Sequence, residues 1–176
     1  GSVFRKTFGD WTTNPQTGQW NDSQIIVSQR TFGSDAPSVD TCGIESSKVG
    51  MHFDLMIFDD IVDDLNTTTK AQMDKVYECF KKALGILKPE EKIIVLGTRW
   101  HYGDLYGRII EENKRTGKWG IFQRDSDTVG KDGKLIFEDI GLTSKFLKSQ
   151  REELGSYIYS CITVTRQWTM RARYSR

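Results

Sequence analysis

Apolar and polar residues follow two different periods along the chain, and these periods predict strands and helices in turn. Short apolar runs at Asp54–Phe58 and Lys92–Leu96 lack helical spacing, which is typical of buried strands in a parallel sheet. Between them, Thr67 can cap a helix that runs to about Leu84. Its apolar residues recur at helical spacing: Met73, Val76, Tyr77, Phe80 and Leu84.

Weaker signals extend this order on both sides of the two apolar runs. Gln24–Gln29 and Ser38–Cys42 predict two short strands near the start. Three later elements are expected: a helix from about Gly103 with Leu105 and Ile109 inward, a strand at Gly120–Arg124, and a helix from Thr143 to about Leu154, ended by Gly155. Strands alternating with helices predict an α/β fold with a mostly parallel sheet and helices on both faces.

Two adjacent carboxylates, Asp59 and Asp60, end the first apolar run. Ligands of open α/β sheets bind beyond the carboxyl ends of the strands, and nucleotide-bound Mg²⁺ prefers oxygen ligands. Asp59 is therefore a candidate metal ligand, and Asp60 is a candidate to orient or deprotonate an attacking water. An equally good interpretation from this segment alone is a solvated acidic turn that Asp63 and Asp64 continue.

A polar set made of Thr98, Arg99 and His101 follows the second apolar run. If the two strands are parallel neighbours, these residues lie at the same sheet edge as Asp59 and Asp60. From spacing alone, a capping threonine and a surface arginine explain Thr98 and Arg99 almost as well. His101 also fits a residue that merely precedes a helix.

Three segments carry a family resemblance when they are taken in this order: His52-Phe-Asp-Leu-Met-Ile-Phe-Asp-Asp60, Gly97-Thr-Arg-Trp-His101 with Asp104-Leu105 and Gly107-Arg108, and Leu154-Gly-Ser-Tyr-Ile-Tyr-Ser-Cys161. Each segment alone is a weak signal, but the ordered set is fairly specific. Together they resemble the ATPase part of the large terminase subunit of tailed bacteriophages, over about Phe8 to Cys161.

The resemblance implies a P-loop ATPase core of the RecA-like (ASCE) type in a motor that packages double-stranded DNA into the procapsid. It implies a Walker B role for Asp59, which would hold Mg²⁺, and for Asp60, where many such segments carry Glu. It implies that Thr98 and Arg99 form the coupling segment, which senses the γ-phosphate of ATP and transmits hydrolysis to movement. The implied partners are the portal protein, the small terminase subunit and further copies of the chain, in the host cytoplasm.

A phosphate loop of the form GxxxxGK[ST] is missing from this sequence. In the family that loop lies upstream of everything present here, and a nuclease domain lies downstream. The expectation is therefore that residues 1–161 form the C-terminal part of the ATPase domain. Because backbone amides and the lysine of that loop hold the phosphates, we expect these residues alone to be inactive.

The segment 162–176 differs in composition from the rest of the chain. It has four arginines and no acidic residue, so without it the net charge falls from +1 to −3. It shows no convincing period, cap or turn signal. In the family an aromatic residue and Asn-Pro usually follow here, and codons compatible with the tail spell Tyr-Arg-Asn-Pro in another frame. Our hypothesis is a frameshift or sequencing-error product that makes no stable packing or forms only a poorly determined extension; a basic arm that grips DNA phosphates is the alternative.

Composition changes this picture little. With 176 residues, of which 37% are hydrophobic, the chain is long enough for one domain with a real core. No apolar run approaches the ~20 residues that cross a bilayer, so no membrane partner is expected. Cys42, Cys79 and Cys161 are unclustered, which favours reduced thiols over a metal site.

Two functions from other classes remain open. A metal-dependent nuclease would use the acidic cluster around Asp59 and Asp60, with Asp54, Asp63 and Asp64 as further carboxylates. Asp54 and Asp59 lie at opposite ends of one strand, so they cannot share a metal. The other possibility is a non-catalytic virion assembly module in which these acids are ordinary surface residues.

Overall fold

The computed structural model describes residues 6–7, 9–11, 19–30, 36–46, 51, 53–87, 91–162 and 169–172. His52, which carries part of the resemblance, lies outside these ranges. The chain divides into two compact units, Gly1–Phe53 and Asp54–Arg176. Within the described residues the structure is mixed α/β, and no helix there is both long and apolar enough to cross a membrane.

The first unit contains a small antiparallel pair, β1 (Gln24–Ile25) and β2 (Val39–Asp40). Gln24 lies opposite Asp40, and the Thr41 amide donates to the Ser23 carbonyl oxygen at 2.7 Å. Both predicted strands are confirmed in place, although each is only two residues long.

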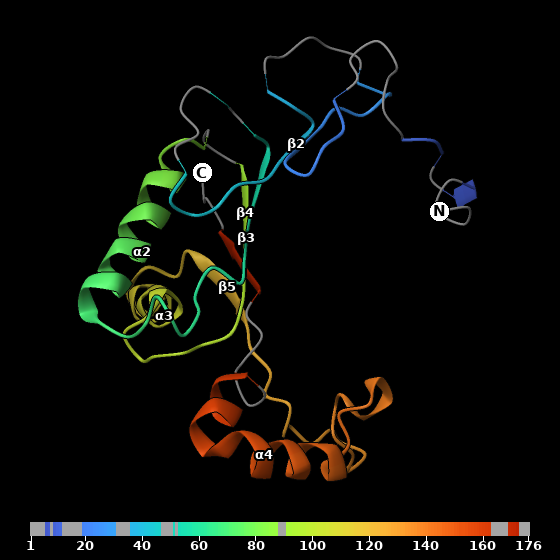
Figure 1. Ribbon diagram of the computed structural model, residues 1–176, viewed down its shortest axis with the longest axis vertical. Coiled ribbons are helices and arrows are strands. Elements are labelled where there is room, and N and C mark those ends of the chain that lie inside the picture. The colour runs from blue at the N-terminus through green and yellow to red at the C-terminus, as the bar shows by residue number, and fades with distance from the viewer. Residues whose placement is uncertain are drawn as a thin grey trace. The chain divides into compact units, whose positions relative to one another are not determined.

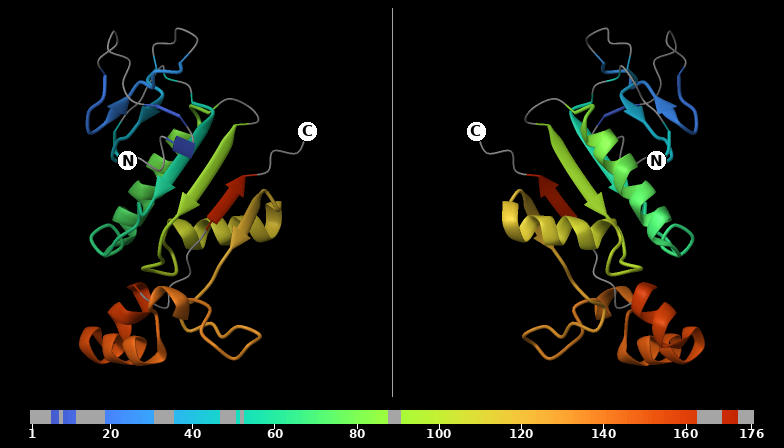
Figure 2. Two further views of the ribbon diagram at one scale, coloured as in Figure 1. Left: turned by 90° about the vertical axis from the view of Figure 1, so that its right-hand side faces the viewer. Right: turned by 90° about the vertical axis from the view of Figure 1, so that its left-hand side faces the viewer.

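The second unit is built on a four-stranded sheet in the order β3 (Leu55–Asp59), β4 (Lys92–Leu96), β6 (Thr169–Ala172), β5 (Trp119–Phe122). The predicted parallel pairing of β3 with β4 is confirmed, with Leu55 opposite Lys92 and Asp59 opposite Leu96. β6 runs antiparallel to both of its neighbours, as Figure 2 shows. The sheet is therefore mixed instead of mostly parallel, and β3 is its outer strand in the described residues instead of a central one.

β6 is the part of the tail beyond Ile162 that the structure describes, and it is paired where the sequence predicted no stable packing or only a poorly determined extension. Met170 lies opposite Val95 of β4 and opposite Ile121 of β5, so the backbone of this strand is paired on both sides. The reason is that β4 and β5 lie one strand apart, and their inner backbone donors and acceptors require partners. Such pairing needs only four extended residues and no side-chain period, so the composition of the tail did not predict this strand.

Two helices lie on one face of this sheet, α2 (Lys70–Leu84) and α3 (Leu105–Thr116) (Figure 1). Phe80 of α2 packs on Phe58 of β3 with ring centroids 4.9 Å apart, and on Trp119 at 6.3 Å. The buried core gathers here: Phe58, Val62, Met73, Val76, Phe80, Ile93, Val95, Leu105, Tyr106 and Ile109. Leu55 and Ile57 point to the other face and are exposed. Among the described residues of this unit, the predicted helical layer on that second face is not found.

The start of α2 corrects the predicted cap. Thr69 is the N-cap, and it forms a capping box in which Gln72 bonds back to the Thr69 backbone amide. Thr67 instead donates its hydroxyl to the Asp63 carbonyl oxygen at 2.7 Å. A capping box needs Glu or Gln three residues after the cap, and Thr67 has Lys70 at that position.

The last helix, α4 (Ser144–Ile162), follows a short 3₁₀ turn, η1 (Glu138–Ile140). The Phe146 amide donates to the Thr143 hydroxyl at 3.2 Å, which confirms the predicted cap. Gly155 interrupts the helix with φ 75° and ψ 160°, a conformation that favours glycine. The predicted break is therefore in the right place, but the chain becomes helical again beyond it.

Candidate functional site

The carboxyl ends of β3 and β4 meet at one edge of the sheet. Asp59 is paired with Leu96, and the next amide, that of Asp60, donates to the Leu96 carbonyl oxygen at 3.1 Å. Thr98 follows Leu96 by two residues. The structure thus confirms that Asp59, Asp60 and Thr98 lie at the same edge.

Asp60 is in an unusual backbone conformation. Its φ is +48°, which no other non-glycine residue in the described part of the chain shares in sign. A left-handed conformation costs about 1–2 kcal/mol for residues other than glycine; aspartate adopts it more often than most of them, and the strain remains. Both Asp59 and Asp60 are exposed. A strained residue that presents a carboxylate at a strand end is a hypothesis of function.

The turn after Asp60 is organised by its own side chains. Asp63 accepts the Asn66 amide at 2.8 Å, and the Asp64 carbonyl oxygen accepts the Thr68 hydroxyl at 3.0 Å. These contacts fit the interpretation of Asp63 and Asp64 as exposed turn acids. Across the described residues, no group of three or more His, Cys, Asp and Glu side chains could hold a metal ion.

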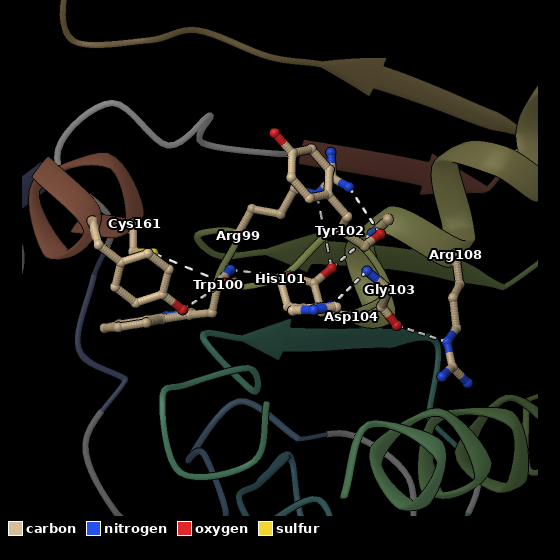
Figure 3. Close-up of polar contacts among 10 residues, drawn as sticks. Arg99, Trp100, His101, Tyr102, Gly103, Asp104, Arg108 and Cys161 are labelled. Atoms are coloured by element: carbon tan, nitrogen blue, oxygen red, sulfur yellow. Dashed lines mark hydrogen bonds and ion pairs between the residues drawn. The ribbon is translucent and has the colours of Figure 1, made fainter. Parts of the chain in front are cut away.

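A different carboxylate, that of Asp104, organises the segment after β4. Asp104 is 0% exposed, and it is the N-cap of α3. One of its oxygens, Oδ2, accepts the amides of Trp100 at 3.0 Å and His101 at 3.1 Å. The other, Oδ1, accepts the Gly107 amide at 2.8 Å. Figure 3 shows Asp104 beside Trp100 and His101. One carboxylate thus joins the loop 98–103 to the first turn of α3.

Arg99 is directed at this carboxylate and at its own loop. Its Nε lies 3.9 Å from Asp104 Oδ1, and within the described residues that buried nitrogen makes no hydrogen bond. Nη2 donates to the Tyr102 carbonyl oxygen at 3.0 Å, and the guanidinium carbon lies 5.2 Å from the centre of the Tyr102 ring. Figure 3 shows the side chain folded back in this way. Its side chain is only 17% exposed, so Arg99 is not a plain surface arginine.

His101 has a local contact that matches its alternative interpretation. Its Nδ1 accepts the Gly103 amide at 2.9 Å, which shapes the turn before α3. Arg108 then ties that turn to α2, since its Nε donates to the Gly103 carbonyl oxygen at 2.9 Å and its Nη2 pairs with Asp74 at 2.6 Å. This ion pair, together with Lys70, lowers the pKa of Asp74, with the hydrogen bond from Lys70 as the larger cause.

Tyr106 of α3 contacts the carboxyl end of β4. It is fully buried, and its hydroxyl donates to the Leu96 carbonyl oxygen at 3.0 Å. Burial raises the pKa of Tyr106, and the negative charges of Asp60 and Asp104 raise it further. Sequence reasoning did not single out Tyr106 or the buried carboxylate of Asp104. The available signal was an aspartate directly before Leu105 in a helical pattern, which is typical of an N-cap.

The third segment of the resemblance contacts the second one. Tyr157 donates its hydroxyl to the Trp100 carbonyl oxygen at 3.3 Å, and Cys161 Sγ lies 3.9 Å from the same oxygen. Figure 3 shows Cys161 beside Trp100. Burial raises the pKa of the Cys161 thiol. None of Cys42, Cys79 and Cys161 forms a disulfide in the structure.

Comparisons with known proteins do not identify a family for this chain. No protein-family model matches the chain, and a search of the curated proteins finds no match.

Proposed function

We propose that this chain belongs to an ATP-hydrolysing motor that packages double-stranded DNA into a phage procapsid, as part of the ATPase core of a large terminase subunit. The observation that carries the proposal is the position of Asp60. It presents an exposed carboxylate from a strained backbone, and its amide is bonded to the end of β4, where Thr98 and Arg99 follow. A parallel strand pair with polar side chains beyond both carboxyl ends is where α/β proteins bind nucleotides.

The donor set at the end of β3 suits Mg²⁺. Proteins often bind this ion through only one or two carboxylates, with phosphate oxygens and waters as the other ligands. Asp59 is the proposed ligand, and it is exposed at the strand end. One carboxylate is enough for this ion, so no further protein ligand is required. When bound, the ion offsets negative charge on the phosphates of ATP. Asp60 is proposed to orient or deprotonate the attacking water, with a side chain one methylene shorter than glutamate.

Thr98 and Arg99 are proposed to couple hydrolysis to movement. Thr98 follows the end of β4 by two residues, and its hydroxyl is proposed to sense the γ-phosphate of ATP when the nucleotide is bound. Arg99 is bonded to the Tyr102 carbonyl oxygen and lies near Asp104, so a shift at Thr98 is passed into the start of α3. In this proposal the motor acts as a homo-oligomer with the portal protein and the small terminase subunit in the host cytoplasm.

The nuclease alternative is less well supported. Asp54 lies just before β3, where its carbonyl oxygen accepts the Lys92 amide at 3.2 Å, whereas Asp59 ends the strand. The two carboxylates are therefore at opposite ends of one strand, so they cannot bind one metal. No observation favours the assembly module over the motor.

The proposal is tested on the longer protein that contains this chain together with a phosphate loop. Asp60→Asn keeps the size of the side chain and tolerates the left-handed backbone. We expect ATP hydrolysis to be lost while the affinity for ATP is retained. Asp63→Asn is the matched control, because it makes the same change in the neighbouring turn. Unchanged turnover in Asp60→Asn would show that another residue is the catalytic carboxylate, and a wild type without ATPase activity would refute the proposed function.

A further inference from the structure

We propose that Asp104 is a positioning residue, which holds the loop 98–103 in the shape that places Thr98 and Arg99 beside the strand end of Asp60. This inference rests on the proposed function, since it assigns the support of the same site. Asp104 itself is fully buried and acts through its neighbours.

The first support is that the loop depends on this carboxylate for its hydrogen bonds. Trp100 and His101 lie between β4 and α3, where neither strand pairing nor helical bonding serves their amides. Both amides donate to Asp104 Oδ2. Hydrogen bonds to a charged acceptor are stronger than neutral ones, and they fix the direction of the backbone.

The second support is charge. A buried carboxylate is stable only with a cation or several donors close by. Asp104 has three amide donors, and Arg99 Nε lies at 3.9 Å from its Oδ1. Arg99 is therefore held in place by the same group that bends the loop, which links its position to that of Trp100.

The third support is the close contact between the loop and α3 at Gly107. A Cβ atom at this position would lie 2.1 Å from the Tyr102 carbonyl oxygen and 2.9 Å from Arg99 Nη2. Only glycine lets the loop lie this close to the helix. The loop is thus fixed by hydrogen bonds on one side and by packing on the other.

Asp104 both caps α3 and accepts the loop amides, and a substitution by asparagine affects these two roles differently. As an N-cap, asparagine is about as good as aspartate, so α3 keeps its cap. Its amide nitrogen cannot accept a hydrogen bond, so one oxygen must serve three amides that two oxygens serve now. Asp104→Asn therefore loosens the loop without removing the helix start.

The experiment measures loop order and activity separately. In Asp104→Asn we expect the amides of Trp100 and His101 to exchange hydrogen about tenfold faster or more, because a charge-assisted bond is lost. In the longer protein with a phosphate loop, we expect kcat for ATP hydrolysis to fall about 10²-fold with little change in KM, as for a small misplacement of reacting groups. Gly107→Ala should give the same pattern, because it displaces the Tyr102 carbonyl and leaves the carboxylate intact.

Asp132→Asn is the matched control. It makes the same change at an exposed aspartate, whose Oδ1 accepts the Lys134 amide at 3.2 Å in a turn remote in sequence from the loop 98–103, so neither readout should change. Unchanged exchange in Asp104→Asn would overturn the inference, whatever the activity. Faster exchange with unchanged kcat would also overturn it, because the loop would then not matter for turnover. A wild type without ATPase activity would refute the proposed function instead, and the exchange rates would still decide whether Asp104 orders the loop.

Discussion

The carboxyl ends of β3 and β4 lie at one sheet edge, but the carboxylates that follow these two strands differ in exposure. At the end of β3, Asp60 is exposed and its backbone is strained. Beyond the end of β4, Asp104 is fully buried and accepts three amides. The β3 end therefore presents charge to solvent, whereas the buried charge beyond β4 fixes the shape of the loop that follows this strand. Substitutions should therefore affect stability strongly at the β4 end and weakly at the β3 end.

The largest effect is expected from ending the chain after Ile162, which removes β6. β4 and β5 would both lose a strand partner, whereas β3 is paired with β4 and, within the described residues, is not paired with β6. Several backbone hydrogen bonds at about 1 kcal/mol each suggest a loss of about 3 kcal/mol in the free energy of unfolding. Urea denaturation measures the loss. A change within about 0.5 kcal/mol, as for ordinary surface changes, would mean that the tail does not pack.

Gly97→Ala should be the next most damaging change. A Cβ atom there would lie 1.9 Å from the Tyr106 hydroxyl, and the φ of Gly97 is +153°. We expect a loss of about 2 kcal/mol from overpacking, measured by thermal or urea unfolding. Gly117→Ala is the control, because its φ is also positive but no atom lies within 4 Å of the added carbon. Equal losses in both variants would show that backbone strain, not the clash, is responsible.

Tyr106→Phe should cost about 1 kcal/mol, since the hydrogen bond to the Leu96 carbonyl is lost. It should also change the alkaline limb of the stability curve. The folded state raises the pKa of Tyr106, so it favours the protonated hydroxyl. That contribution is complete below the ordinary tyrosine pKa of about 10, and it disappears as the pH rises from there through the higher folded-state pKa. Unfolding midpoints from pH 8 to 11 should therefore fall less steeply in the variant. Parallel curves would contradict this.

The smallest effect on stability is expected at Asp60. Asp60→Gly should leave the free energy of unfolding unchanged or raise it by up to about 1 kcal/mol, because glycine adopts the left-handed backbone without strain. Asp60→Asn should stay within about 0.5 kcal/mol of the wild type. Chemical denaturation checks both variants. A marked loss in either would show that the Asp60 side chain supports the fold, and the contrast between the two strand ends would then disappear.

The sequence predicted the strand pair because short apolar runs without helical spacing are typical of strands. Asp54–Phe58 and Lys92–Leu96 are such runs, and their common edge follows from parallel pairing. The cap of α2 was predictable in principle, since Gln72 follows Thr69 by three residues. The predicted cap at Thr67 is wrong because Lys70, not Glu or Gln, lies three residues after it.

Other features depend on contacts that no local pattern encodes. The burial of Asp104 depends on backbone amides up to four residues upstream, which carry no residue-specific signal. The pairing of β6 depends on backbone groups of β4 and β5, so its side chains give little information. The same holds for the outer face of β3, where apolar residues predicted a second layer of helices.

The break at Gly155 has a consequence for the end of α4. It leaves Ser156–Ile162 as a separate seven-residue segment, well below the roughly 12–15 residues that an isolated helix needs in water. Its helical form therefore depends on tertiary contacts, which are those of Tyr157 and Cys161 with the Trp100 carbonyl and the hydrogen bond from buried Tyr159 to Asp127. Its helix content is then a built-in reporter: a spectroscopic label on these two turns would register whether the loop after β4 is seated or displaced.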